Sequence, residues 1–139
     1  MTSSADAAPA RPLVEHYGTP MLNGQRLPFS RAVRVGDILY LSGAIGRGPD
    51  GKPPEGIEAQ TKATMDDIGD SLKLAGLTHR DIFHCTVFLS DMKNWAAFNQ
   101  VYVTYFPDGP LPARSAFGAN GLALGARLEI ECQAYAGKK

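Results

Sequence analysis

The stretch Ile82–Leu89, "IFHCTVFL", decides the fold, because it is apolar on both sides when it is written as a β-strand. Side chains alternate between the two faces of a strand. One face then carries Phe83, Cys85, Val87 and Leu89, and the other carries Ile82 and Phe88. A sheet that contains this strand needs cover on both sides.

Two helices are predicted around this strand. Before it, apolar or small residues recur at steps of three and four, as an amphipathic helix requires: Ile57, Thr61, Met65, Ile68, Leu72 and Ala75. Gly76 follows as a C-cap. After the strand, Asp91 is placed to cap a second helix. Its aromatic stripe, which we interpret as core, consists of Trp95, Phe98, Tyr102 and Tyr105.

Four further strands complete the expected domain. Two short strands flank a Gly36-Asp37 turn within residues 32–46, and two more lie near residues 113–119 and 126–135. The order β-β-α-β-α-β-β predicts an α+β fold, with a mixed sheet and two helices packed on one face. We expect residues 13–139 to form a single domain and residues 1–12, rich in Ala, Ser and Pro, to form a loose tail.

The second face of this sheet is left open by the two helices. The last strand places Leu128, Ile130, Cys132 and Ala134 toward the helices, and Arg127, Glu129, Glu131 and Gln133 on the open side. That side is either solvated, as in many antiparallel sheets, or covered by another subunit. The doubly apolar strand favours a subunit interface, where these charges would need a partner from protein or ligand.

Composition narrows the class of protein. The chain has 139 residues and a formal net charge of zero, so it lacks the basic field that gathers nucleic acid. Its His and Cys residues make no metal-binding spacing, and we interpret Cys85 and Cys132 as small buried hydrophobic residues in a reducing compartment. Without an apolar segment of signal-peptide or membrane-spanning length, the chain is expected to be soluble and cytoplasmic.

Arg114 is the most informative single charge. It lies in "PLPARSAFGANG", residues 110–121, among small and apolar residues. It either ends a strand with its side chain in water or binds a carboxylate. A planar guanidinium can bind a carboxylate through two parallel hydrogen bonds.

Four pieces of the chain, spread from Pro28 to Ala136, resemble the YjgF/RidA family of reactive-intermediate deaminases, also labelled endoribonuclease L-PSP-like. They are "PFSRAVRVGDILYLSGAIG", "TVFLSDMKNWAAFNQVYVTYF", "PARSAF" and "ARLEIECQAYA". The resemblance implies a chorismate-mutase-like fold and a homotrimer with clefts between subunits. It also implies hydrolysis of 2-imino or 2-enamino acids to 2-keto acids and ammonia, without a metal or cofactor.

The resemblance also implies site residues. The carboxylate-binding arginine falls on Arg114 and the water-handling glutamate on Glu129. The substrate-binding positions fall on Phe29, Ser42, Gly43, Asn99 and Ala116.

Some of these positions depart from the common pattern. Many members read P-Y-S-Q-A-V where this chain has "PFSRAV", so Phe29 replaces a tyrosine. Ala44 stands in place of a glutamine, Ala116 in place of a cysteine, and "LALGA" in place of "LPKGA". We therefore expect deamination that is weak or directed at other substrates. The alternatives are a related hydrolase of another carboxylate-bearing catabolite, a non-enzymatic binder of small carboxylates, and a ribonuclease, which the neutral charge disfavours.

Overall fold

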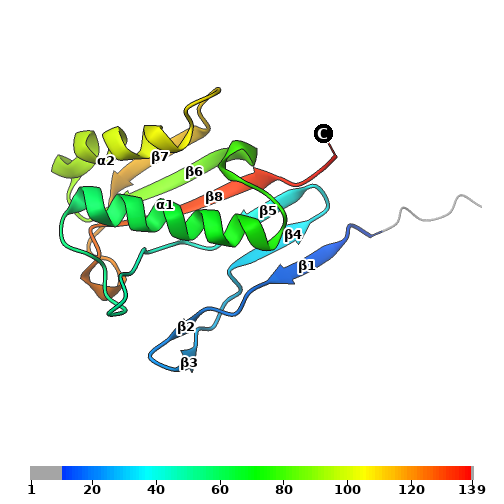
Figure 1. Ribbon diagram of the computed structural model, residues 1–139, viewed down its shortest axis with the longest axis horizontal. Helices are drawn as coiled ribbons and strands as arrows, with labels where there is room; N and C mark the ends of the chain where they lie inside the picture. Colours follow the sequence, from blue (N-terminus) through cyan, green and yellow to red (C-terminus); the bar gives the residue numbers. More distant parts are fainter. Residues whose placement is uncertain (1–10, 139) are drawn as a thin grey trace, which may run out of the picture.

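Residues 11–138 are described by a computed structural model, in which one six-stranded mixed sheet carries both helices on the same face (Figure 1). The sheet order is β1-β4-β5-β8-β6-β7, and only the β6–β7 pair is parallel. The strands are β1 Val14–Tyr17, β4 Ala32–Val35, β5 Ile38–Leu41, β6 Ile82–Leu89, β7 Ala113–Gly118 and β8 Leu128–Tyr135. A separate hairpin joins β2 Met21–Leu22 to β3 Gln25–Arg26.

The helices lie where the sequence places them. α1 spans Ile57–Leu74 and α2 spans Trp95–Tyr102, and short 3₁₀ turns occupy His79–Asp81, Met92–Asn94, Val103–Tyr105 and Ala123–Gly125. Gly76, at φ 74°, ends α1: its N–H donates to the carbonyl of Lys73, and the N–H of Leu77 donates to that of Leu72. This pair of bonds satisfies two carbonyls that the helix leaves free. Asp91 caps the 3₁₀ turn before α2 by accepting from the N–H of Lys93.

The core lies between the helices and the sheet. Met65, Ile68 and Leu72 of α1 meet Leu39 of β5 and alternate residues of β6 and β8. β8 follows the predicted alternation, with Leu128, Ile130, Cys132 and Ala134 buried. The aromatic stripe of α2 is core at Phe98 and Tyr102, whereas the Trp95 side chain is 45% exposed.

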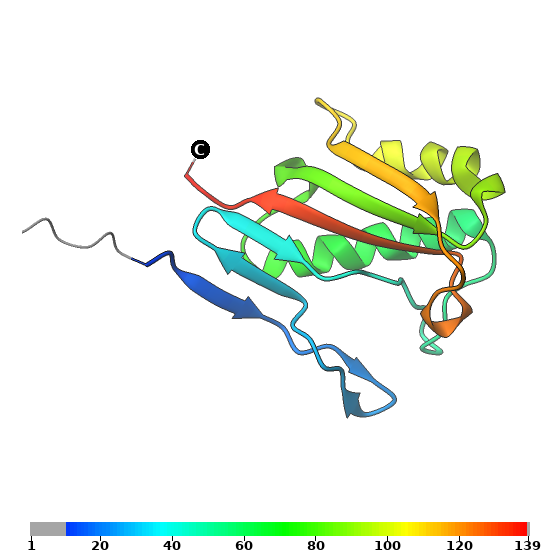
Figure 2. The ribbon, with the colours of Figure 1, turned by 180° about the vertical axis from the view of Figure 1, so that it is seen from behind.

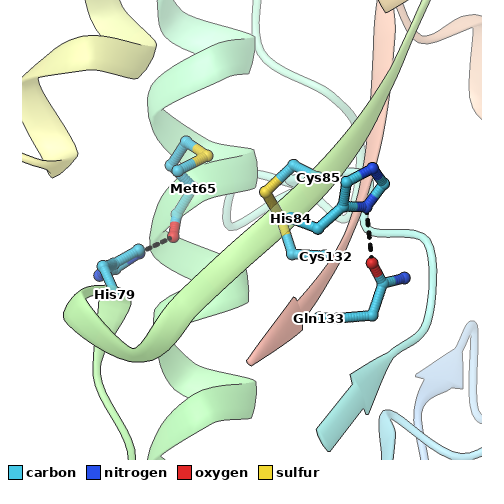
Figure 3. Close-up of a disulfide and its surroundings, with 6 residues drawn as sticks. All are labelled: Met65, His79, His84, Cys85, Cys132 and Gln133. Carbon is cyan, nitrogen blue, oxygen red and sulfur yellow. Dashed lines mark hydrogen bonds between the residues drawn. A yellow bond between two sulfur atoms is a disulfide. The ribbon is translucent and has the colours of Figure 1, made fainter. Parts of the chain in front are cut away.

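The two cysteines are buried as predicted, but the prediction that they are free thiols was wrong. Cys85 and Cys132 are fully buried and form a disulfide between β6 and β8 (Figure 3). The register of the two antiparallel strands sets them directly opposite one another, with 4.0 Å between the Cα atoms, so their side chains meet on the same face. His79 and His84 flank this region and donate to the carbonyl of Met65 and the side chain of Gln133.

The opposite face of the sheet carries no helix within the described residues (Figure 2). The side chains of Tyr40, Phe88 and Phe117 lie on it, and Phe88 and Phe117 are in edge-to-face contact, 4.9 Å between ring centroids. The register of β6 shifts between Ile82 and His84, which buries Ile82 and exposes Phe83, the reverse of the predicted faces. The predicted tail, residues 1–12, lies outside the described residues except for Arg11 and Pro12.

Candidate functional site

A cavity of about 250 Å³ opens where the chain leaves β5 and turns toward α1. Four of the seven predicted site residues line it: Phe29, Ser42, Gly43 and Glu129. Much of the remaining wall is apolar and comes from the β2–β3 hairpin and the 3₁₀ turn before β8: Pro20, Leu22, Leu27, Ala123 and Leu124. A small organic molecule with one polar end suits such a wall.

Glu129 is the second residue of β8, and its side chain lies beside the backbone of Gly43. Ala44 and Ile130 exchange two backbone hydrogen bonds, 2.8 and 3.1 Å, which hold residues 43–45 beside β8. A Cβ atom on Gly43 would lie 3.0 Å from both Cδ and Oε2 of Glu129. Glycine at this position leaves room for the Glu129 carboxylate in its present place, and the backbone there adopts no left-handed angle that would itself favour glycine.

Burial raises the pKa of Glu129, and the neighbouring charge of Glu131 raises it further. Both effects disfavour the charged carboxylate. A carboxyl group whose pKa moves toward neutrality is a better proton acceptor and donor under ordinary conditions.

Ser42 and Phe29 are held by the same backbone contacts. The N–H of Ser42 donates to the carbonyl of Arg31, and its hydroxyl donates to the carbonyl of Ser30 at 2.6 Å. Ser42 thus fixes the segment that carries Phe29, whose side chain is 47% exposed. The remaining hydrogen-bonding capacity of the Ser42 hydroxyl is as an acceptor.

Sequence reasoning missed four polar residues of this cavity, Arg31, Arg47, Asp67 and Ser71. Arg31 donates from Nε to Oγ of Ser71 at 3.0 Å, and from Nη2 to the carboxylate of Asp67 at 2.7 Å. Burial raises the pKa of Asp67, and the Arg31 charge opposes that rise. The available signal was the spacing of Phe29 and Arg31, since residues two apart in extended backbone point to the same side.

The other three predicted residues, Asn99, Arg114 and Ala116, lie away from this cavity. The guanidinium carbon of Arg114 is 5.3 Å from the ring centroid of Phe98 and 4.8 Å from that of Tyr102. No carboxylate of residues 11–138 forms an ion pair with it. The two rings stabilise the cation through their π faces while leaving its N–H groups available for an anion.

Two polar side-chain atoms of α2 have no hydrogen-bond partner in the described part of the chain. They are Oδ1 of Asn99 and the hydroxyl of Tyr102, one helical turn apart on α2. Burial raises the pKa of Tyr102, and the charge of Arg114 opposes the rise. Buried polar groups are nearly always paired, so these two are placed to meet a ligand or another subunit.

Within one chain, the cavity residues around Glu129 lie apart from Arg114 and the aromatic rings beside it. Arg114 pairs with Cys85, so its side chain shares the helix-covered face of the sheet. Glu129 pairs with Phe88, one side-chain alternation away, on the open face. Three residues along the strand and two strand spacings separate their Cα atoms by roughly 14 Å. Within one chain, the sheet therefore lies between these two side chains.

No group of three His, Cys, Asp or Glu residues within 11–138 could hold a metal ion. No helix in that range is long and apolar enough to cross a membrane.

Comparison with known proteins agrees with this architecture. The family model described as "Endoribonuclease L-PSP" matches residues 23–136. A mouse protein named 2-iminobutanoate/2-iminopropanoate deaminase is 38% identical over 112 residues, covering 79% of this chain and 82% of its own. Reactive Intermediate Deaminase A, chloroplastic, of Arabidopsis thaliana is 36% identical over 76% of this chain and 57% of its own length.

Solved structures have the same fold. The crystal structure of YyfA from Yersinia pestis, described as a protein of unknown function of the conserved Rid family, superposes with a TM-score of 0.81. It is 34% identical, and the match covers 88% of this chain and 99% of that one. The extent of these matches, in sequence and in fold, shows that the chain belongs to the YjgF/RidA family.

Proposed function

We propose that the protein is a hydrolytic deaminase of reactive 2-imino and 2-enamino acids. In the imine, water adds to the C=N carbon, the C–N bond breaks, and the products are a 2-keto acid and ammonia. The relatives named as imine deaminases support this reaction type. It requires only water and groups that position it and move protons, so we propose no metal and no cofactor.

Arg114 binds the substrate carboxylate in this proposal. Its N–H groups have no ion-pair partner in residues 11–138, and the Phe98 and Tyr102 rings hold the cation in place. A bidentate contact fixes the plane of the carboxylate and of the adjacent C=N bond. Oδ1 of Asn99, buried and unpartnered, is suited to accept from the imine nitrogen, and Ala116 leaves room beside the arginine.

Glu129 handles the water. Its raised pKa suits a group that accepts a proton from the attacking water and returns it to the leaving nitrogen. The imine is already electrophilic, so correct positioning supplies much of the acceleration. Phe29, Ser42 and Gly43 form the wall against which the substrate side chain lies.

The active unit is an oligomer. The observation that carries this is the placement of Arg114 and Glu129 on opposite faces of one sheet. A second copy that packs on the open face brings its arginine group to the first copy's glutamate group. Cyclic repetition of this head-to-tail contact closes a ring. We propose the homotrimer, with a chorismate-mutase-like arrangement and three intersubunit clefts, and a cytoplasmic location stays a prediction.

A panel assay tests the proposal. Imines are generated in situ from a set of amino acids by an amino-acid oxidase, and ammonia release is followed with and without the protein. We expect release to rise above the spontaneous rate for at least one imine, and to fall to background with Glu129→Gln. No acceleration of any imine by a protein that still binds 2-keto acids would instead favour a non-enzymatic binder.

A further inference from the structure

Arg31 is a second guanidinium at the proposed site, and it is held rigidly. Its Nε donates to Oγ of Ser71, and its Nη2 donates both to the carboxylate and to the carbonyl of Asp67, at 2.7 and 3.1 Å. Its aliphatic stem packs beside Gly18, where a Cβ atom would lie 2.9 Å from Cδ of the arginine. Four separate contacts therefore fix the plane of this guanidinium.

These contacts leave part of the guanidinium unused. Nη1 has no hydrogen-bond partner among residues 11–138, while Arg31 lines the same cavity as Phe29 and Glu129. The Arg31 side chain keeps 27% of its surface exposed. Two N–H groups of a fixed cation thus remain for a ligand.

The surroundings of Arg31 favour an anionic ligand group over an apolar one. Arg31 and Arg47 supply the positive charge of the wall, and Asp67 and Glu129 supply the negative charge. Burial raises the pKa of both carboxyl groups, and the ion pair with Arg31 opposes this rise at Asp67. The remaining wall is largely apolar, so an aliphatic substrate side chain would leave the free N–H groups of Arg31 without a partner.

We propose that Arg31 selects substrates with a second carboxylate, so that the preferred substrates are the 2-imino acids of dicarboxylic amino acids. This rests on the proposed deaminase function. Arg114 of a neighbouring copy holds the 1-carboxylate, and Arg31 holds the distal one. Hydrolysis then gives a 2-keto dicarboxylic acid and ammonia, with water as the sole co-reactant.

A purely structural role for Arg31 predicts no change in substrate preference when Arg31 is replaced. As a tether between α1 and the segment that carries Phe29, Arg31 would affect all substrates alike. The ratio of kcat/KM for a dicarboxylic imine to that for a monocarboxylic imine separates the two roles, because a general loosening of the wall cancels in the ratio.

The experiment compares imines generated from glutamate and from 2-aminobutyrate, using the wild type, Arg31→Gln and Arg34→Gln. Arg34, on β4, donates to the carbonyl of Gly36 and does not line the cavity, so it is the matched control. We expect the wild type to favour the glutamate-derived imine, Arg31→Gln to lower the ratio by about 10- to 100-fold, and Arg34→Gln to leave it unchanged, since one charge-assisted hydrogen bond is at stake.

Binding of stable products to the wild type gives a second measurement that does not depend on any variant. We expect 2-ketoglutarate to raise the melting temperature more than 2-ketobutyrate at equal concentration. Equal ratios in the wild type and Arg31→Gln, or stronger protection by 2-ketobutyrate, would overturn the dicarboxylate proposal while leaving the deaminase function in place. Absence of turnover with every imine would instead remove the deaminase function itself.

Discussion

Arg114 and Glu129 lie on opposite faces of the same sheet, because Arg114 is in register with Cys85 and Glu129 with Phe88. Each residue has what the other lacks. The arginine has aromatic support and no carboxylate partner within residues 11–138, and the glutamate lines a cavity that Arg114 of the same chain does not line. The reaction proposed above therefore depends on contact between copies of the chain.

Mixing two impaired variants tests this dependence directly. Alone, Arg114→Lys is expected to keep at most about a tenth of wild-type activity and Glu129→Gln only the background rate. Co-expressed, each variant supplies the residue that the other has lost. In a randomly assembled head-to-tail ring about one quarter of the clefts carry both native residues, so about a quarter of wild-type activity should return. A mixture as inactive as its components would show that both residues act from the same chain or not at all.

Arg114→Lys alone should lose activity and keep the fold. An ammonium retains the cation–π contact with Phe98 and Tyr102 but cannot form two parallel bonds to a carboxylate. Loss of one charge-assisted hydrogen bond lowers kcat/KM by roughly 10- to 100-fold. Circular dichroism and light scattering check that the secondary structure and mass are unchanged; unfolding or dissociation of the variant would assign the arginine a structural role.

Gly43→Ala should damage the site through one methyl group. The new Cβ would lie 3.0 Å from the end of the Glu129 side chain, which is flexible enough to move aside without disturbing the backbone. We expect a large fall in kcat with little change in melting temperature. Gly109→Ala is the control, because nothing lies within 4 Å of its added Cβ. Full activity in Gly43→Ala would mean that the position of this carboxylate is irrelevant to turnover.

The pH dependence of activity should follow Glu129. Burial, and after it the charge of Glu131, raises the pKa of this carboxyl group. Glu131→Gln removes the second cause, so the acidic limb of the kcat/KM profile should move to lower pH. Glu58→Gln, on the exposed first turn of α1, should leave the profile in place.

The raised pKa of Glu129 also affects the stability of the fold. Its contribution to stability changes with pH in the opposite direction to that of a salt-bridged carboxylate. A raised pKa in the folded state favours the protonated form, so its stabilising contribution is present at low pH and is lost as the pH rises through the folded-state pKa. Glu129→Gln should therefore be more stable than the wild type at neutral pH, and the difference should shrink on acidification. Equal denaturation midpoints at pH 7 would contradict the burial of the charge.

Local patterns predicted most of the elements. The bounds of β6 and the end of α1 at Gly76 follow from alternation, helical spacing and a glycine C-cap. β1 and the β2–β3 hairpin were not predicted: β1 is only four residues long, and its sequence VEHY does not alternate apolar with polar residues. The hairpin turns at Asn23-Gly24, both at positive φ, a signal that the sequence contained.

The site was harder to predict because it depends on register. Nothing local shows that Cys85 faces Cys132, that Ile82 and Phe83 exchange faces at a bulge, or that Asp67 and Ser71 of α1 reach Arg31. The separation of Arg114 from Glu129 also follows only from pairing both strands with β6. The family resemblance supplied residue identities, and the register supplied their placement.

The Cys85–Cys132 disulfide yields the last prediction. It links β6 to β8 in the core, closes a loop with a sequence separation of 47, and both sulfur-bearing residues are fully buried. In the chain-entropy account a loop of this length stabilises the fold by about 4 kcal/mol. Reduction should therefore lower the denaturation midpoint markedly. The bond should be reduced only after partial unfolding, because reductant cannot reach it in the native state.

Thiol alkylation in denaturant distinguishes the two redox states. We expect no labelling of the unreduced protein and labelling of two cysteines after reduction. Cys85→Ala combined with Cys132→Ala is the control, since its denaturation midpoint should not respond to reductant. Two alkylated thiols in protein purified without reductant would contradict the disulfide and restore the interpretation of both cysteines as buried hydrophobic residues.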